Sequence, residues 1–325
     1  MALRGSHAYA LSIALLAPAL VHTGASAQQY PTRAVRMVVG FAAGGATDIS
    51  ARALAQKLSE TLGQQVIVDN RPGASSMLAA EIVARSAPDG YNLLFANATI
   101  AMPSLFAKLP FDVRKDLTPV SLAGYGPLAL TAHPSLPART IKELIALARR
   151  KPGELNYASA GPGSFTHLAM ALLVLMTDTK IVHIPYKGGA PSVIATMSGE
   201  SHMTFASVGA SIPPIRQGKL RGIAVSGLQR NVALPEVPTV SEGGVTGYDA
   251  TSWYGMFARG STPHPMVTKL GEHATKVLTD AQLKETLLSQ GIEPARGGVE
   301  EFNGYFSAEM AKWAKVIKAA AIPAQ

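Results

Sequence analysis

Two glycine-rich loops carry the clearest chemical signal in the chain. Residues 42–48 (AAGGATD) follow an apolar run of strand length, and residues 159–164 (SAGPGS) follow a second one about 115 residues later. Where a strand leads into a helix, the first helical N–H groups have no internal partner, and the helix dipole adds partial positive charge. Missing side chains let an anion approach that backbone closely. Either loop alone is equally well explained as a tight turn, but the pair favours two anion seats, which would suit a dicarboxylate.

Polar side chains near these loops extend the candidate site. Thr47 and Ser164 can add hydroxyl donors, and Asn97 and Thr99 follow a third apolar run at its carboxyl end. Ligands of parallel α/β sheets lie at the carboxyl ends of the strands. Loop capping is the simpler role for Asn97 and Thr99. Lys187 stands beside another glycine pair and could reach an anion, although an exposed lysine is the simpler interpretation.

Backbone amides alone can supply the affinity of such a site. A micromolar dissociation constant requires about −8 kcal/mol. A hydrogen bond to a charged group contributes about 1.5–3 kcal/mol. About five or six such bonds therefore cover the requirement, with a surplus against the cost of ordering the ligand. No buried counter-ion is needed, and none is evident in the two loops.

Catalysis and metal binding have weaker support. Residues 161–165 (GPGSF) lack the Gly-x-Ser-x-Gly elbow of hydrolases. Ser164 and His167 share one helical turn, so they point outward side by side rather than base toward nucleophile. The histidines show no metal-ligand spacing, and a lone glycine-rich match near Gly40 is too weak to predict a dinucleotide. We expect no catalytic residue, metal or cofactor; an exported hydrolase using Ser164 or Ser159 is the alternative.

The elements that position these residues repeat in the order strand, loop, helix. This order predicts parallel sheets with helices on both faces. An apolar segment at 120–132 is a candidate crossover between two such sets, and Trp313 is expected in the core. Strands are predicted at 35–41, 66–68, 91–96, 155–158, 181–184, 202–205, 220–225 and 251–258, and helices at 47–62, 77–86, 141–150, 164–176, 192–197, 266–279, 280–290 and 300–320.

The N-terminus predicts export. Arg4 precedes an apolar run at 8–21 that is too short to span a bilayer, and Ala25-Ser26-Ala27 has the small-x-small pattern of a cleavage site. We interpret residues 1–27 as a signal peptide and Gln28 as the mature N-terminus. No cysteine follows to carry a lipid anchor or a disulfide, and no later apolar run is long enough to span a membrane. We therefore expect a soluble periplasmic protein with little access to ATP or NAD.

Composition narrows the function classes further. The mature chain has roughly 300 residues, enough for two domains with separate cores. The hydrophobic content of 47% and the charged content of 15% fit a compact globular protein. The net charge of +8 is compatible with acidic ligands, but the charges are scattered and aromatics are only 6%. A nucleic-acid surface needs clustered basic residues with stacking aromatics, so we set that class aside.

Several motifs together resemble the Bug-type substrate-binding proteins of tripartite tricarboxylate transporters. They are spread in order over nearly the whole mature chain and are specific as a set. The matching stretches are 38–52 (VVGFAAGGATDISAR), 69–73 (DNRPG), 88–94 (PDGYNLL), 109–117 (LPFDVRKDL), 156–168 (NYASAGPGSFTHL), 183–191 (HIPYKGGAP), 218–220 (GKL) and 234–242 (LPEVPTVSE).

The resemblance implies a two-lobed periplasmic-binding-protein fold of type II that performs no chemistry. Each lobe would be a mostly parallel sheet flanked by helices, with the ligand cleft between the lobes. Lobe one would comprise residues 28–125 and 227–325, and lobe two residues 126–226. A monomeric receptor would capture a small organic carboxylate and deliver it to the membrane permease, although a periplasmic sensor would use the same cleft. The ligand-binding positions carried over are Ala43, Gly44, Gly45, Thr47 and Asp48 in lobe one, and Ser159, Gly161, Ser164 and His167 in lobe two.

Two departures from the family pattern bear on the ligand. Ala43 stands where the family usually has proline, which loosens one backbone angle and leaves the donors in place. Ala206 stands where the family often has aspartate, so an acceptor for a ligand ammonium group is absent. We therefore expect carboxylates without an amino group. The identity of the acid depends on the side chains of 97–102, 205–208 and 251–254, and aliphatic dicarboxylates, tricarboxylates and aromatic acids all remain open.

Overall fold

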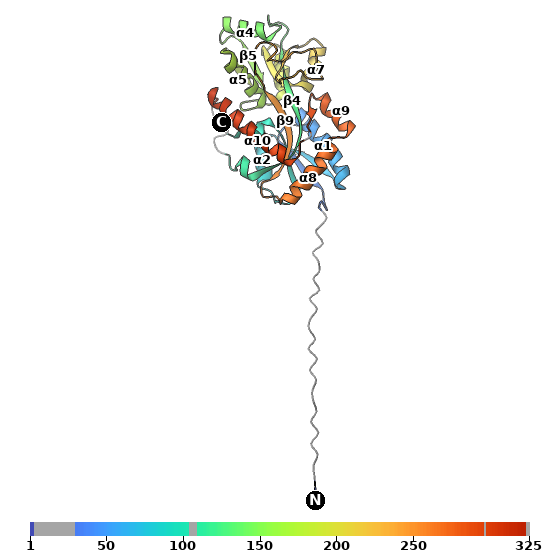
Figure 1. The fold of residues 1–325 in the computed structure, drawn as a ribbon. Coiled ribbons are helices and arrows are strands. Elements are labelled where there is room, and N and C mark those ends of the chain that lie inside the picture. Colours follow the sequence, from blue (N-terminus) through green and yellow to red (C-terminus); the bar gives the residue numbers. More distant parts are fainter. Residues whose placement is uncertain (3–29, 104–108, 296, 323–325) are drawn as a thin grey trace.

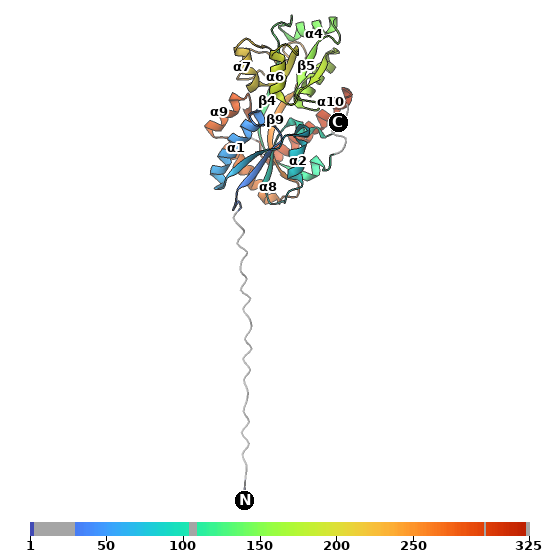
Figure 2. The same ribbon diagram turned by 180° about the vertical axis from the view of Figure 1, so that it is seen from behind.

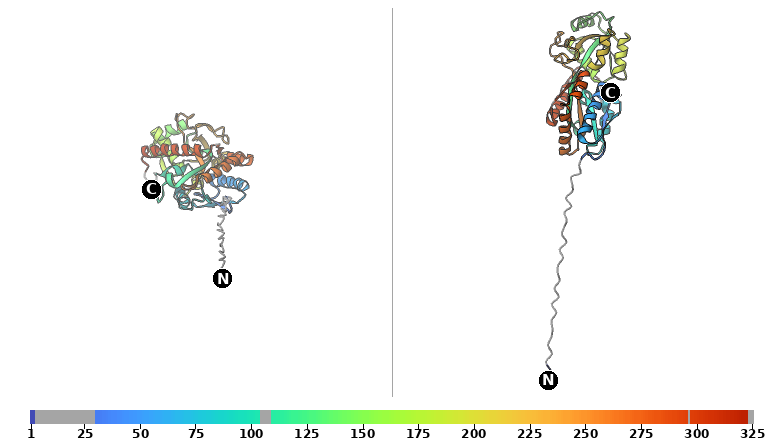
Figure 3. Two further views of the ribbon diagram at one scale, coloured as in Figure 1. Left: turned by 60° about the horizontal axis from the view of Figure 1, so that its bottom comes forward. Right: turned by 90° about the vertical axis from the view of Figure 1, so that its right-hand side faces the viewer.

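The computed structural model describes residues 1–2, 30–103, 109–295 and 297–322. The predicted signal peptide falls almost entirely outside these residues. The described chain forms two halves, one above the other, joined by strands that run through both (Figure 1). Helices flank each half, and the view from the side shows the two halves as separate bodies around a narrower middle (Figure 3).

The first half is built on three parallel strands that are buried on both faces. Strand β1 pairs with β2 on one side and β3 on the other. Residues with β-branched and other apolar side chains dominate these strands because helices cover both faces of the sheet. The elements are β1 (Val35–Val39), α1 (Ala46–Leu62), β2 (Val66–Asn70), η1 (Ala74–Ser76), α2 (Met77–Ala84), β3 (Asn92–Asn97), η2 (Ala98–Ala101) and α3 (Val113–Asp116).

Two long antiparallel strands connect the halves. Strand β4 (Leu117–Ala132) has 16 residues; its first part pairs with β9 (Thr251–Arg259), and its last part pairs with strands of the second half. Strand β9 also pairs with β3, antiparallel. The sequence predicted a mostly parallel sheet in each lobe and did not identify these antiparallel pairs. They arise because β4 runs from the first half into the second and β9 runs back beside it.

The second half repeats the parallel arrangement. Strand β5 pairs in parallel with β6 and β7, and the helices lie on both sides of this sheet (Figure 2). A helix over 208–216 was not predicted, because it contains two prolines, Pro213 and Pro214, which normally interrupt helical hydrogen bonding. The elements are α4 (Ile141–Arg150), β5 (Asn156–Ser159), α5 (Phe165–Thr177), β6 (Val182–Pro185), α6 (Gly189–Met197), β7 (Met203–Ser207), α7 (Val208–Arg216) and β8 (Arg221–Val225).

The C-terminal segment returns to the first half and contacts both halves. It contains α8 (His264–Val277), α9 (Ala281–Ser289), β10 (Glu293–Pro294) and α10 (Val299–Ala319). Helix α10 contacts β4 and η2, and it also contacts α5 of the second half. Trp313 is fully buried there, packs edge-on against Phe165 and donates its indole N–H to Glu309, which confirms its predicted core role. Within the described residues, none of the helices has the length and apolarity to span a bilayer.

Candidate functional site

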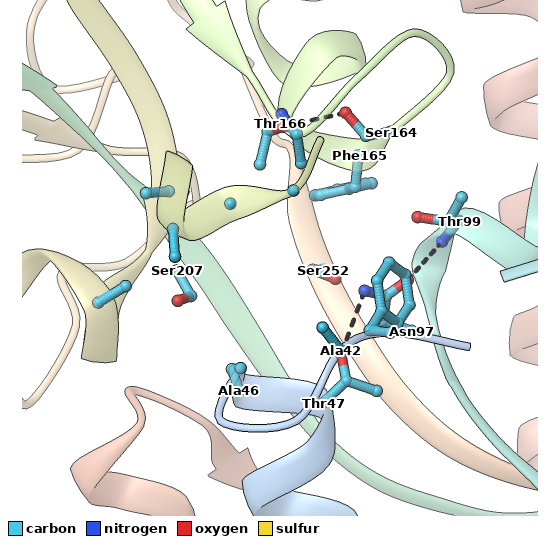
Figure 4. A pocket seen from close by; sticks show the side chains of 18 of the residues that line it. Ala42, Ala46, Thr47, Asn97, Thr99, Ser164, Phe165, Thr166, Ser207 and Ser252 are labelled. Carbon is cyan, nitrogen blue, oxygen red and sulfur yellow. Dashed lines mark hydrogen bonds between the residues drawn. The ribbon is translucent and has the colours of Figure 1, made fainter. Parts of the chain in front are cut away.

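A cleft of about 350 Å³ lies between the two halves, at the ends of the parallel strands. Its wall on the first half consists of the loop before α1, together with Asn97 and Thr99 after β3. Its wall on the second half consists of the loops before α5 and α6 and the start of α7, and its floor includes residues of β4 and β9 (Figure 4). The lining residues are Phe41, Ala42, Ala43, Gly44, Gly45, Ala46, Thr47, Asn97, Thr99, Leu128, Ala160, Ser164, Phe165, Thr166, Lys187, Gly188, Gly189, Ala190, Pro191, Ala206, Ser207, Ala210, Ser252 and Tyr254.

Four of the described helices begin at this cleft. Residues from the first turns of α1, α5, α6 and α7 all line it. Each helix start presents unpaired N–H groups and the positive end of the helix dipole, so the cleft is electropositive without arginine. Of the described lining residues none is acidic, and the exposed Lys187 is the single charged one. The arrangement favours an anion.

The first glycine loop is held from behind by Asp48. Its buried carboxylate accepts from Gly44 N at 2.9 Å, from Asn70 Nδ2 at 2.9 Å and from Arg52 Nε at 3.1 Å, and it does not line the cleft. Burial alone would raise the pKa of Asp48, but hydrogen bonds from Arg52, Gly44 N and Asn70 outweigh it and lower the pKa. Asp48 therefore positions the loop and is already satisfied by its own partners.

Helix α1 begins without a capping side chain. The helix predicted over 47–62 starts at Ala46, and its N-cap is Gly45. No described group accepts from the N–H of Gly45, Ala46 or Thr47. Gly44 N, in contrast, is taken by Asp48. A glycine cap leaves the first free amides of the helix open to the cleft, because no side-chain oxygen competes for them.

The second glycine loop contributes fewer cleft residues than expected. Of its four predicted site residues, Ser164 lines the cleft, whereas Ser159, Gly161 and His167 are not part of the lining. Ser164 caps α5: its Oγ donates to Gly161 O at 2.6 Å and accepts from His167 N at 3.3 Å. The hydroxyl proton of Ser164 is therefore already used in a hydrogen bond within the loop. The carry-over by motif could not separate residues that face the cleft from residues that shape it.

A buried serine and two stacked histidines support this loop. Ser159 is fully buried; its Oγ lies 2.6 Å from His183 Nε2 and accepts from Gly161 N at 3.1 Å. His183 stacks on His167 with ring centroids 4.0 Å apart, and His167 Nδ1 accepts from Gly163 N at 3.2 Å. A serine beside a histidine is the arrangement of a hydrolase, but Ser159 and both histidines lie outside the cleft lining. The cluster holds the loop in shape.

Protonation of the stacked histidines should destabilise the fold. Burial and the neighbouring His183 lower the pKa of His167 to about 4, and burial lowers the pKa of His183. Both rings titrate near 6.5 in the unfolded chain, so the unfolded state binds more protons between these values. The neutral rings therefore contribute fully to the free energy of unfolding above about pH 6.5, and this contribution is lost as the pH falls toward about 4.

We therefore expect His167→Gln to flatten the dependence of melting temperature on pH. Between about pH 7 and pH 4.5, the melting temperature of wild type should fall more than that of His167→Gln. Glutamine does not titrate, and a protonated His183 then has no second imidazolium beside it. Differential scanning fluorimetry across this range measures it. The exposed His264 supplies the control variant, His264→Gln, which should follow wild type. Parallel curves for all three proteins would contradict the assignment.

The end of β3 brings Asn97 and Thr99 into the cleft. Asn97 Oδ1 accepts from Thr99 N at 3.1 Å, which caps the short helix η2, and its Nδ2 lies 3.4 Å from Thr47 Oγ1. Asn97 therefore serves as a loop cap and as a cleft residue at once. Ala206 also lines the cleft and is 2% exposed.

Several cleft residues had no individual signal in the sequence. Ser252 and Tyr254 belong to a segment expected to decide the ligand, but nothing in the sequence singled them out. They reach the cleft because β9 pairs with β3 and β4, which sets Tyr254 opposite Asn97 and Ser252 opposite Gly126. Lys187 lines the cleft at its exposed rim. Ser207 lines the cleft from the expected segment 205–208, and the lining residues that were not expected include Phe41, Leu128, Phe165, Thr166 and Ala210.

Comparisons with known proteins agree with this geometry. A family model for the tripartite tricarboxylate transporter family receptor, TctC, matches residues 50–322. Protein BugT of Bordetella pertussis is 34% identical over 306 residues, covering 93% of this chain and 94% of that protein. The structure of R. palustris Rpa4515 with adipate has a TM-score of 0.85 and 36% identity, covering 90% of this chain and 99% of that one. MatC (Rpa3494) from Rhodopseudomonas palustris with bound malate has a TM-score of 0.80 and 30% identity, covering 89% and 100%.

These matches settle the class of the protein. The expected α/β fold of periplasmic binding proteins is confirmed. The family consists of solute-binding receptors rather than enzymes. The chain therefore belongs to the receptor family of tripartite tricarboxylate transporters, and its resemblance to the Bug-type members is confirmed.

Proposed function

We propose that this receptor binds a small organic carboxylate without an amino group in the cleft between its halves. The observation that carries the proposal is the convergence of four helix N-termini on a cleft whose described lining holds no acidic side chain. Carboxylates gain from such donors, whereas a buried ammonium group would lack an acceptor, and desolvating a bare charge costs several kcal/mol. Asp48 cannot serve as that acceptor, because three donors already occupy its carboxylate.

The ligands of related proteins support the same class. Rpa4515 was solved with adipate and MatC with malate, and both are amino-free dicarboxylates. The cleft volume of about 350 Å³ accommodates a molecule of this size. In the proposed mechanism, residues 28–125 with 227–325 and residues 126–226 act as two lobes that close on the ligand. The strands β4 and β9, which pass between the halves, would form the hinge.

We infer delivery to a membrane permease, and membership of a transporter receptor family supports this. We infer export to the periplasm from the predicted leader, a mature chain beginning at Gln28, and a monomeric receptor that performs no chemistry of its own. Intact mass of protein recovered from the periplasmic fraction should correspond to a chain that starts at Gln28 or within a residue or two. A full-length mass in that fraction would contradict the proposed location.

A thermal-shift panel tests the ligand class. Succinate, glutarate, adipate and benzoate would be compared with aspartate and glutamate. Aspartate and glutamate are succinate and glutarate with an added ammonium group. At one hundred times its dissociation constant, a true ligand should stabilise the fold by about 2.7 kcal/mol. We expect at least one amino-free acid to reach this and both amino acids to fail. A larger shift with aspartate or glutamate would overturn the proposal.

A further inference from the structure

Two side-chain hydroxyl groups in the cleft have no hydrogen-bond partner among the described residues. Ser252 of β9 is 2% exposed, and Thr99 of η2 is 1% exposed. Both residues line the cleft. Neither Oγ forms a hydrogen bond with any described residue, whereas the hydroxyls of Ser164 and Thr166 are both engaged in the loop before α5. Figure 4 shows Ser252 on the strand at the centre of the view and Thr99 to one side of it, on η2.

A cleft hydroxyl that no neighbouring residue engages is free to bond a ligand. When a ligand displaces water from the cleft, it must itself pair such a hydroxyl, because a polar group that is removed from water and left unpaired is costly. Ser121 of β4 shows the contrast: its Oγ is fully buried and also unpartnered, but Ser121 does not line the cleft. The two cleft hydroxyls can reach a ligand, and the Ser121 hydroxyl cannot.

The chemistry of the two hydroxyls differs from that of the helix starts. A backbone N–H only donates, whereas a serine or threonine hydroxyl both donates and accepts. An ionised carboxylate can use only the donor half. A hydroxyl substituent on the ligand can use both halves, because it accepts from one residue and donates to the other. A keto oxygen on the ligand can accept a hydrogen bond from each of the two hydroxyls.

The position of the hydroxyls matches the middle of a ligand. The helix starts surround the cleft on its two walls, where the charged ends of a ligand would lie. Ser252 belongs to β9, which pairs with β3 and β4, and it appears between Asn97 on one wall and Ser207 on the other (Figure 4). Thr99 is held in the lining by the Asn97 cap of η2. Leu128 and Ala206, which also line the cleft, are apolar.

We propose that Ser252 and Thr99 select a carboxylate that carries an uncharged oxygen substituent, hydroxyl or keto, on its carbon chain. This inference rests on the proposed function and names the substrate class of the same cleft. A site built to bond a ligand hydroxyl discriminates against the analogue that lacks it, because its own buried hydroxyls are then left unpaired. Ser252 and Thr99 are in this sense specificity-determining residues.

Matched acid pairs test the selection by titration calorimetry. The pairs are succinate with malate and glutarate with 2-hydroxyglutarate, and the readout is the ratio of their dissociation constants. We expect wild type to bind the hydroxylated member of at least one pair about tenfold or more tightly. Ser252→Ala and Thr99→Val should reduce that ratio to below about threefold, whatever their effect on the affinity for the unsubstituted acid. Thr99→Ser should retain the preference.

The control is Ser121→Ala, which removes an unpartnered buried serine hydroxyl from β4 outside the cleft. Melting temperatures establish that each variant is folded, and Ser121→Ala should keep the wild-type ratio. A wild type that prefers the unsubstituted acids, or cleft variants that keep the wild-type preference, would overturn the inference. If the hydroxyls bond only to water, Ser252→Ala will change the affinities for both members of a pair equally, which also overturns the inference. Failure of every carboxylate to bind wild type would instead refute the proposed function.

Discussion

Gly45→Val should weaken ligand binding by at least about a hundredfold while leaving the protein folded. Gly45 is the N-cap of α1 with φ −82°, a conformation open to other residues. A Cβ there would meet only Ala42 O at 3.8 Å, so the fold has room for it. The branched side chain would instead occupy the cleft and cover the free amides of Ala46 and Thr47. Losing two hydrogen bonds to a charge costs about 3–6 kcal/mol, which exceeds a hundredfold.

The matched control for this variant is Gly298→Val. Gly298 is the N-cap of α10 with φ −77°, its Cβ would meet no atom of the described residues within 4 Å, and it is not among the residues that line the cleft. Both variants should have similar melting temperatures, and titration calorimetry should show wild-type affinity for Gly298→Val alone. Gly44→Val is unsuitable, since Gly44 has φ +86°. Affinity within threefold of wild type for folded Gly45→Val would exclude this loop as the anion seat.

A negative charge at position 206 should nearly abolish binding of amino-free dicarboxylates. Ala206→Asp and Ala206→Asn add side chains of almost equal size to the same buried position in the cleft lining. Two like charges about 4 Å apart repel by about 4 kcal/mol at an effective dielectric constant of 20. We therefore expect the dissociation constant of Ala206→Asp to exceed that of Ala206→Asn by about a hundredfold or more.

The comparison of the two variants isolates charge from volume. Melting temperatures show whether each variant folds, and the asparagine variant reports the steric cost alone. The aspartate variant should also bind glutamate or aspartate better, relative to the amino-free acids, than wild type does, because it supplies an acceptor for the ammonium group. Equal affinities of the two variants for a dicarboxylate would show that Ala206 has no electrostatic influence on the ligand.

The features predicted well from the sequence are those with a local cause. Parallel βαβ units followed from short β-branched runs that alternate with capped helices, and α4 and the C-terminal end of α1 at Gly63 were predicted to the residue. The first glycine loop also lies where it was expected, in the cleft lining. In each case, the physical determinant lies within about a dozen residues of the element it governs.

The features that were missed depend on contacts distant in the sequence. Ser252 and Tyr254 enter the cleft because β9 returns to pair with β3, a register that no local pattern encodes. Helix α7 forms despite two prolines because tertiary packing overrides intrinsic propensity. Ser159 and His167 have the residue types of a binding site, but their partners His183 and Gly163 turn them into supports of the loop. Residue type indicated the loops that border the cleft and could not indicate which of their side chains line it.

Backbone amide shifts would test the central claim most directly. In a two-dimensional ¹⁵N–¹H NMR titration with an amino-free dicarboxylate that binds, the amide signals of Gly45, Ala46 and Thr47 should shift. The three titration curves should give the same dissociation constant as calorimetry. Gly44 should move much less, because its N–H already donates to Asp48. A ligand that saturates the protein and leaves the signals of Gly45, Ala46 and Thr47 unmoved would contradict an anion seat at the start of α1.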